Sequence, residues 1–322
     1  MENTKNKERI SVVVPCFNEQ ETLRKLYEEL DKTAFTMEEY EFEFIFVNDG
    51  SKDRTILQMR ELAEADQRVK YISFSRNFGK ESALLAGLAA STGDYVATMD
   101  ADLQDPPSLL PQMVKPVAEG LCDNVATRRV NRKGEPLIRS LCARTFYKIM
   151  RHMSDVDIAD GARDYRLMNR VMVDSILSLS EYNRFSKGIF AWVGYETRWL
   201  AYENIARTAG ETKWSFWKLV KYSVDGIVNF SNVPLLFASY LGIGLTIASF
   251  AAILFEIIRY FLFGDPVSGW PSLVCIITFL GGIQLFCMGI MGQYISKTYM
   301  EVKKRPHYII KESNIETGKS LD

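Results

Sequence analysis

Apolar and polar positions alternate in blocks over the first hundred residues. Four short apolar runs have the length of buried strands: 10–14, 42–47, 69–74 and 95–99. The segments between them carry apolar residues at helical spacing: 19–30, 53–65 and 80–90. This repeated alternation predicts a doubly wound α/β domain with a parallel sheet. The carboxyl ends of the strands would then meet at one edge, where ligands bind in such folds.

The last third of the chain has a different pattern. The runs 235–255 and 273–295 contain no Asp, Glu, Lys or Arg, and each is long enough to cross about 30 Å of hydrocarbon. Their connecting loop, 264–272, has no Lys or Arg, whereas basic residues flank the pair on its other side: Lys213, Lys218, Lys221, Lys297, Lys303, Lys304 and Arg305. This asymmetry predicts two membrane spans with both ends in the cytoplasm. The alternative, a core helix of a soluble protein, is disfavoured because two such runs follow each other.

The patterns together predict four regions. The segment 215–230 has apolar residues on one side and charges on the other, as in helices that lie on a membrane surface. We therefore expect the following division: 1–212 a cytoplasmic domain, 213–232 a juxtamembrane amphipathic helix, 233–297 a two-span transmembrane region, and 298–322 a cytoplasmic C-terminal tail. Within the first region, 160–169 is charged and turn-rich, 171–179 is a predicted helix and 195–202 a predicted strand. The expected location is the inner membrane of a cell.

Composition excludes several other classes of protein. The 322 residues have a formal net charge of −1, so no nucleic-acid partner is expected. Five cysteines occur without a CxxC pair and the two histidines are far apart, which argues against a zinc site or a disulfide framework. No GxGxxG follows the first predicted strand and no GxxxxGK[ST] occurs, so dinucleotide and P-loop binding lose support. Residues 1–9 are polar and charged, unlike a signal peptide.

Polar side chains follow three of the predicted strands. Asp100, Asp102 and Gln104 come directly after the fourth strand, and carboxylate plus amide oxygens suit a hard divalent cation that also binds phosphates. Asp49 follows the second strand, where a carboxylate can accept hydrogen bonds from a ribose or a base. The segment 15–19 follows the first strand. The alternative is that these residues only form turns. This alternative is disfavoured because polar residues follow three different predicted strands.

A basic segment extends from 128 to 151. It contains one acid, Glu135, and eight basic residues: Arg128, Arg129, Arg132, Lys133, Arg139, Arg144, Lys148 and Arg151. Three interpretations compete, namely a solvated face, a patch for an anionic leaflet, and ligands for phosphate. For the cluster as a whole we favour phosphate and leaflet together.

Several motifs in this sequence resemble those of the inverting family 2 glycosyltransferases. They are PCFNE at 15–19, VNDGS at 47–51, SRNFGK at 75–80 and DADLQDPP at 100–107, followed by the two C-terminal spans. The most similar subgroup is the bactoprenol-phosphate glucosyltransferases, which are related to dolichol-phosphate mannose synthase. The resemblance covers roughly residues 10–310. The Gln-x-x-Arg-Trp motif of processive members is absent, since no Gln occurs between Gln112 and Gln284, and this favours transfer of a single sugar.

The resemblance implies a nucleotide-diphospho-sugar transferase (GT-A type) domain and a set of site residues. Those implied to bind the donor are Pro15, Phe17, Glu19 and Asp49 at the base and ribose, Asp100 and Ala101 near the ribose and sugar, and Arg128, Arg207 and Lys213 near the diphosphate. Asp102 and Gln104 are implied to bind Mg²⁺ or Mn²⁺ and, with Asp100, to serve catalysis. Arg139 and Arg144 are implied to lie near the acceptor phosphate.

The expected reaction transfers one hexose from a nucleotide sugar, best UDP-glucose, to polyprenyl (undecaprenyl) phosphate at a membrane. A phosphate monoester is largely a dianion at neutral pH, so the acceptor needs no general base to become nucleophilic. Direct attack would invert the anomeric carbon and give a β-linked product. The alternatives are the same reaction with UDP-GlcNAc or GDP-mannose, and a non-enzymatic protein that binds nucleotides or carries a lipid-linked sugar. Ala238 and Gly242 form a small-xxx-small step, which together with the resemblance suggests a homo-oligomer.

Overall fold

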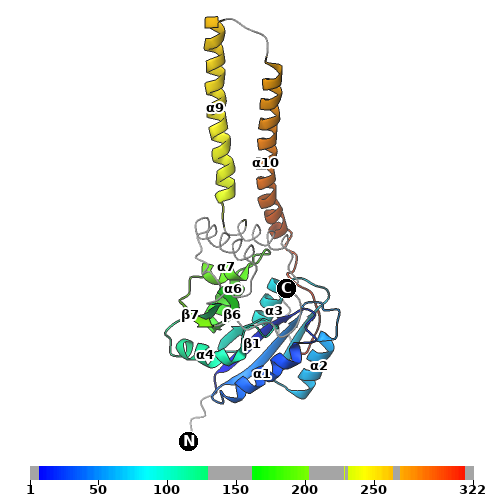
Figure 1. Cartoon of the computed structure of the whole chain (residues 1–322). Helices are drawn as coiled ribbons and strands as arrows, with labels where there is room; N and C mark the ends of the chain where they lie inside the picture. Colours follow the sequence, from blue (N-terminus) through cyan, green and yellow to red (C-terminus); the bar gives the residue numbers. More distant parts are fainter. Residues whose placement is uncertain (1–6, 130–161, 203–227, 229–230, 264–268, 316–322) are drawn as a thin grey trace.

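The computed structural model describes residues 7–129, 162–202, 228, 231–263 and 269–315. Its centre is one eight-stranded sheet in the order β7-β5-β6-β4-β1-β2-β3-β8 (Figure 1). The four predicted strands are present and parallel to one another: β1 (Arg9–Cys16), β2 (Glu41–Asn48), β3 (Val69–Phe74) and β4 (Tyr95–Thr98). The predicted doubly wound α/β fold is confirmed.

Helices cover both faces of the sheet, which explains why its central strands are continuous apolar runs. Along β1, Val12 and Val14 pack into the core on one face and Val13 into the core on the other. The first core contains side chains of α1 (Leu23–Phe35), α2 (Thr55–Ala65) and α4 (Leu110–Ala118), the last preceded by the short 3₁₀ helix Pro107–Leu109. The second core contains those of α3 (Lys80–Ala90), α6 (Arg170–Ser178) and α7 (Ser186–Trp192).

Four further strands widen the sheet, of which one, β7, corresponds to the predicted strand 195–202. They are β5 (Asn124–Arg129), β6 (Ala162–Asn169), β7 (Thr197–Tyr202) and β8 (Ile310–Ser313). β6 runs antiparallel to β4 and β5, and β8 runs antiparallel to β3. The charged segment 160–169 is therefore largely a strand, because its alternate residues Tyr165 and Leu167 are buried in the first core. Since β6 is antiparallel, its first residues lie at the carboxyl edge of the parallel strands.

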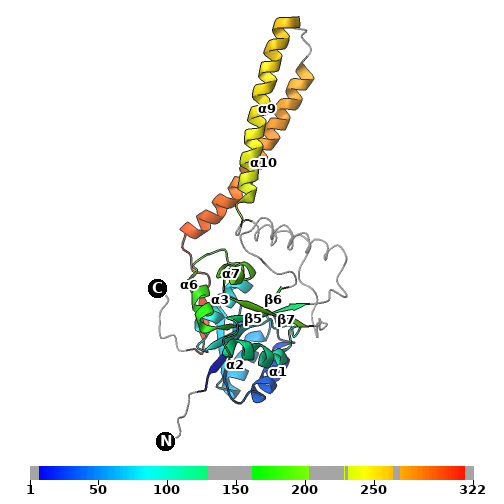
Figure 2. The same ribbon diagram turned by 90° about the vertical axis from the view of Figure 1, so that its left-hand side faces the viewer.

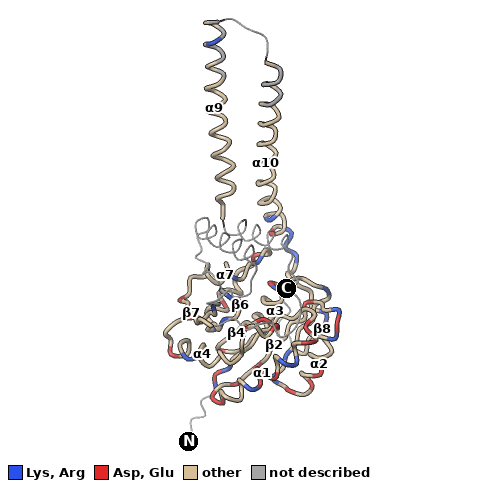
Figure 3. Tube along the Cα trace, viewed as in Figure 1, with Lys and Arg blue, Asp and Glu red and all other residues tan. Residues whose placement is uncertain are grey.

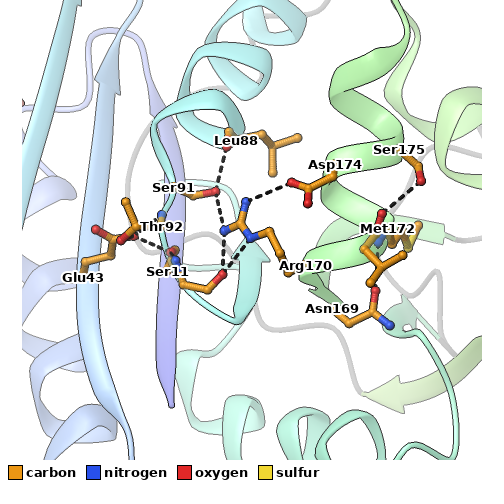
Figure 4. Close-up of polar contacts among 12 residues, drawn as sticks. Ser11, Glu43, Leu88, Ser91, Thr92, Asn169, Arg170, Met172, Asp174 and Ser175 are labelled. Atoms are coloured by element: carbon orange, nitrogen blue, oxygen red, sulfur yellow. Dashed lines mark hydrogen bonds and ion pairs between the residues drawn. The ribbon is translucent and has the colours of Figure 1, made fainter. Parts of the chain in front are cut away.

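The opposite, amino edge of the sheet is closed by a polar network (Figure 4). The buried carboxylate of Glu43 accepts hydrogen bonds from Ser11 Oγ at 2.5 Å and from the Thr92 backbone N–H at 2.7 Å. Arg170, at the start of α6, donates to the Gly93 carbonyl at 2.9 and 2.5 Å and to Ser91 Oγ at 3.2 Å. These bonds satisfy the buried polar groups and join β1, β2 and α6. The network is structural, and it leaves the carboxyl edge as the place for chemistry.

Two long helices extend from the domain on the side opposite the N-terminus (Figures 1 and 2). α9 (Val233–Phe263) and α10 (Trp270–Val302) contain the predicted runs 235–255 and 273–295. Their apolar windows are long enough to span a membrane, and none of either window is buried inside the described structure. A soluble core helix would be buried, so this alternative does not fit. Figure 3 shows few charged residues along these helices and basic residues where α10 ends.

The C-terminal region of the chain returns to the sheet. Within residues 298–322, expected to form a cytoplasmic C-terminal tail, α10 continues to Val302 and 310–313 form β8 at the edge of the sheet. Tyr308 stacks on Phe74 with ring centroids 4.9 Å apart, and Arg60 pairs with Glu312. The edge of β3 offers unpaired backbone groups, and a returning strand satisfies them. The predicted helix 213–232 lies outside the described residues except at 228 and 231–232.

Gly50 provides the first testable prediction. It has a φ of +65°, and a Cβ at this position would lie 2.4 Å from the backbone carbon of Arg76. We expect Gly50→Ala to destabilise the protein by about 1–3 kcal/mol or more, because it combines φ strain with a clash against backbone. Gly120→Ala is the matched control, since Gly120 has a φ of +68° and no atom within 4 Å of its Cβ position. If both variants lose the same thermal stability, the contact between the new Cβ and the Arg76 backbone does not contribute to the destabilisation.

Candidate active site

The loops that follow the first two strands are joined by hydrogen bonds. After β1, the Asn18 N–H donates to Ser51 Oγ at 2.9 Å, and Asn18 Oδ1 accepts from the Lys52 N–H at 2.9 Å. The Glu19 N–H donates to Thr55 Oγ1 at 2.9 Å. The structure therefore brings the segments 15–19 and 48–55 together, as expected for neighbouring parallel strands. Phe17, within the first of these segments, has 36% of its surface exposed, so its ring is accessible to a ligand.

Asp49 is buried and binds the loop that follows β3. Its carboxylate accepts hydrogen bonds from the backbone N–H groups of Phe78 (2.6 Å) and Gly79 (3.0 Å) and from Asn77 Nδ2 (2.8 Å). Burial raises the pKa of the Asp49 carboxyl, and these N–H groups oppose the rise. The observed contacts give Asp49 a structural role at the start of α3. Its implied contact with base or ribose stays a prediction.

The acidic turn Asp100–Gln104 follows β4 at the same edge. Leu103 has a φ of +57°, which turns the chain sharply, and the Gln104 N–H donates to Asp102 Oδ1 at 3.2 Å. Ala101 is buried, whereas Asp100, Asp102 and Gln104 are partly exposed. The three polar side chains of this turn therefore reach solvent at the carboxyl edge of the sheet.

A lysine at the start of α3 connects this turn with β6. Lys80 Nζ lies 2.5 Å from Asp100 Oδ1 and also binds the carboxylate of Asp164. Burial alone would lower the pKa of Lys80, but the two carboxylates outweigh it and raise the pKa. Burial would raise the pKa of Asp164, but Lys80 and Lys187 outweigh it and lower the pKa, so that Asp164 is ionised at neutral pH. Thr98 Oγ1 donates to the Asp164 carbonyl at 2.6 Å, which fixes β6 beside β4.

A second ion pair supports the end of the acidic turn. Asp105 is fully buried and pairs with Arg163, whose Nε lies 3.1 Å from Oδ1. Tyr202, the last residue of β7, also donates to this carboxylate, and Arg163 Nη2 lies 3.4 Å from Gln104 Oε1. Burial raises the pKa of Asp105, and Arg163 opposes the rise. The turn is thus anchored to β6 and β7.

The donor atoms of this turn fit a divalent cation. Among the described residues, no group of three or more His, Cys, Asp or Glu is placed to hold a metal by itself. Mg²⁺ and similar ions are commonly bound by one or two protein oxygens together with substrate phosphates and water. Asp102 and Gln104 offer one carboxylate and one amide oxygen, two positions apart on an accessible turn. This set suits a cation that arrives with a diphosphate.

Part of the predicted site lies within the described residues. The structure places Pro15, Phe17, Glu19, Asp49 and the acidic turn at one edge, and Arg128 is exposed near the end of β5 at the same edge. Arg139, Arg144, Arg207 and Lys213 lie outside the described residues. No spacing in the sequence indicated that Lys80, Arg163 or Asp164 would join the acidic turn, because these contacts link residues far apart in the chain.

A sheet covered by helices on both faces, with an acidic turn at its carboxyl edge, is the arrangement of GT-A glycosyltransferases. The sequence model described as glycosyl transferase family 2 matches residues 11–177. The prophage bactoprenol glucosyl transferase homolog of Escherichia coli K12 is 42% identical over 94% of this chain and 98% of its own length. The bactoprenol glucosyl transferase of Shigella phage SfII is 42% identical over 95% of this chain and 98% of its own length. The chain belongs to glycosyl transferase family 2 and is a glycosyltransferase.

Among solved structures, a likeness of fold is found with glucosyl-3-phosphoglycerate synthase from Mycobacterium tuberculosis in complex with Mn²⁺, UDP and phosphoglyceric acid. The identity is 21%, the TM-score is 0.45, and the match covers 69% of this chain and 76% of the other.

Proposed function

We propose that this glycosyltransferase transfers one glucose from UDP-glucose to polyprenyl phosphate at the cytoplasmic face of the membrane. The relatives named bactoprenol glucosyl transferase are similar over almost the whole chain, which supports this donor sugar and this lipid acceptor. The reaction would leave a β-linked polyprenyl-phosphate glucose.

The observation that carries the proposal is the position of the acidic turn relative to the long helices. The chain returns from α10 to the sheet at the carboxyl edge, where the Ser75 N–H donates to the Ile309 carbonyl at 3.0 Å. Glu301, near the end of α10, accepts hydrogen bonds from the backbone N–H groups of Tyr182 and Asn183. The edge that carries Asp102 is therefore the edge nearest the apolar helices (Figure 1). A lipid phosphate at the membrane surface and a soluble nucleotide sugar could meet there.

The charges at this edge explain why a cation is expected. Beside the acidic turn, Lys80 and Arg163 are already paired with the carboxylates of Asp100, Asp164 and Asp105. A donor diphosphate and an acceptor phosphate that meet beside Asp102 would repel each other and the nearby carboxylates. A bound Mg²⁺ or Mn²⁺ would neutralise the diphosphate and stabilise it as leaving group. Asp102 and Gln104 would hold the ion.

In this proposal the acceptor phosphate acts as the nucleophile without a general base. One of its oxygens forms a bond to the anomeric carbon while the bond to UDP breaks, which inverts the configuration. Asp164 is held as an ion-paired carboxylate by Lys80, so it is a weak proton acceptor. A phosphate dianion does not need one.

The proposal is tested by incubating membranes that contain the protein with polyprenyl phosphate, Mg²⁺ or Mn²⁺, and labelled UDP-glucose, UDP-GlcNAc or GDP-mannose in parallel. Solvent extraction then separates lipid from nucleotide sugar. The proposal is supported if label enters the lipid phase only when UDP-glucose is the donor. Label only with another donor changes the assigned sugar, and nucleotide binding without any lipid label contradicts the transfer.

Removal of the metal gives a separate prediction. Chelation with EDTA is expected to reduce lipid labelling to background, since the diphosphate then lacks its counter-charge. Added Mg²⁺ or Mn²⁺ should restore it, and the more effective ion identifies the preference. Transfer at an undiminished rate in excess EDTA would show that the cation is not required.

The long helices support a two-span membrane protein with the catalytic domain and both termini in the cytoplasm. α9 starts and α10 ends on the domain side, because β8 returns the chain to the sheet. Basic residues near the end of α10 favour the cytoplasmic side. We also propose that the chain forms a homo-oligomer through its apolar helices, where Gly242 is exposed and Ala238 is partly exposed.

A further inference from the structure

Arg166 is a buried cation in the sheet, close to the acidic turn. It lies on β6 opposite Thr98 of β4, and only 4% of its surface is exposed. Its guanidinium stacks on the ring of Phe190 in α7, with Cζ 3.8 Å from the ring centroid. Its Nε is buried without a hydrogen-bond partner among the described residues. Stacking occupies the face of a guanidinium, whereas the N–H donors lie in its plane, so the contact with Phe190 does not satisfy them.

The nearby carboxylates are already bound by other cations. Asp164, two residues earlier on the same face of β6, is bound by Lys80, and Asp105 is paired with Arg163. Burial lowers the pKa of Arg166 to about 10, and the negative charge of Asp164 offsets only part of this shift. Burial would also lower the pKa of Arg163, but Asp105 outweighs it and raises the pKa. Arg166 is therefore charged at neutral pH, and its charge is incompletely compensated.

Packing alone does not explain an arginine at this position. Alternate residues of β6 face opposite sides of the sheet, and Arg166 shares its face with Met168 of the second core. An apolar side chain would pack against Phe190 there without the cost of burying a charge. Proteins retain such destabilising residues mainly at functional sites. The missing partner of Arg166 is then expected to be an anionic substrate.

The position of Arg166 favours the acceptor phosphate over the donor diphosphate. Lys80 contacts both Asp164 and Asp100, so the segment of β6 that carries Arg166 is joined to the acidic turn. β6 lies on one side of β4, whereas β1 and β2, whose following loops are predicted to bind the nucleotide, lie on the other. The helix α7, whose Phe190 covers the guanidinium, lies at the end of the domain nearest α9 and α10 (Figures 1 and 2). These observations indicate the lipid side of the site.

We propose that Arg166 binds the phosphate of the polyprenyl phosphate acceptor and orients it towards the sugar. This inference rests on the proposed lipid acceptor but not on the identity of the sugar. Because only 4% of Arg166 is exposed, binding brings its flexible side chain out from Phe190 towards the phosphate. Two parallel N–H groups of a guanidinium bind two oxygens of a phosphate, which leaves a third oxygen to attack the anomeric carbon.

The test measures binding of farnesyl phosphate, a short polyprenyl phosphate, to the full-length, detergent-solubilised protein. UDP and Mn²⁺ are present and no sugar donor is added, so the site holds its cation and diphosphate and no transfer occurs. Arg166→Met keeps the packing against Phe190 and removes the charge. We expect its Kd for farnesyl phosphate to rise by about 10- to 100-fold, because charge-assisted hydrogen bonds are lost. Its Kd for UDP with Mn²⁺ should stay at the wild-type value.

Thermal unfolding separates a binding role from a structural one. Removal of an incompletely compensated buried charge should leave the unfolding midpoint of Arg166→Met at or above the wild-type value. Arg184→Met is the matched control. Arg184 is partly buried, but it donates to the carbonyls of Leu179 at 2.6 Å and Ile176 at 3.2 Å, at the end of α6. We expect Arg184→Met to lower the midpoint and to leave the Kd for farnesyl phosphate unchanged.

The inference is overturned if Arg166→Met binds farnesyl phosphate as tightly as the wild type, or if it loses stability and affinity together. Weaker binding of UDP with unchanged binding of farnesyl phosphate would assign Arg166 to the donor and also overturn it. If the wild type binds farnesyl phosphate no more tightly than farnesol, the proposed acceptor is contradicted, and this assignment with it. Absence of lipid label with every donor, while farnesyl phosphate still binds, would contradict the proposed transfer but not the role of Arg166.

Discussion

Replacing Asp102 by alanine is expected to lower sugar transfer by about 10²- to 10³-fold or more while the protein still folds and enters the membrane. Asp102 supplies the only carboxylate that we assign to the cation, so its loss removes the cation that neutralises the donor diphosphate. Because Asp102 lies on an accessible turn, its replacement does not open the core. The measurement is lipid-phase label from UDP-glucose at saturating Mn²⁺, together with thermal unfolding of the purified protein.

Asp94→Ala is the matched control for this variant. Asp94 is an exposed aspartate just before β4, at the amino edge of the sheet, where its carboxylate accepts from the Arg9 N–H at 2.8 Å. Transfer by Asp94→Ala should stay near the wild-type rate, because this carboxylate is at the far end of the same strand. Near-normal transfer by Asp102→Ala, with metal dependence intact, would exclude Asp102 as a metal ligand.

The second large effect is expected from Arg163→Met. Asp105 is fully buried, and Arg163 is the cation that compensates it. Removing one partner of a buried ion pair leaves an uncompensated charge, and this destabilises proteins by about 3–5 kcal/mol. For a domain of this size, the midpoint of thermal unfolding should fall by roughly 6–20 °C. Near-ultraviolet circular dichroism of the solubilised full-length protein provides the measurement.

Two comparisons show whether the stability lost in Arg163→Met comes from the unpaired charge of Asp105. Tyr202→Phe removes a single hydrogen bond to Asp105 and should lower stability by less than Arg163→Met does. Adding Asp105→Asn to Arg163→Met removes both charges and should recover part of the lost stability. Asp105→Asn alone completes the comparison. If the double variant loses as much stability as Arg163→Met and Asp105→Asn lose in sum, the two charges are not coupled and the assignment is wrong.

The sequence determined much of the α/β domain because its signals are local. The apolar runs of β1 to β4 and the helical spacing of α1 to α3 each reside in a few consecutive residues. The acidic turn could be placed at a ligand-binding edge from the order of strand and helix alone, since parallel strands have their carboxyl ends on the same side. Length and lack of charge likewise identified the two long apolar helices.

The tertiary structure decided which polar groups meet. Lys80 reaches Asp100 and Asp164, and Arg163 reaches Asp105, across separations in the chain that no local spacing records. The strand β6 has a charged, turn-rich sequence, and its burial between β4 and β5 outweighs that local preference. The end of the chain joins the sheet as β8 because β3 offers an edge there. Local sequence patterns determine where the helices and strands form. The site is determined by the pairing of buried charges and of strand edges, because this pairing depends on distance in space.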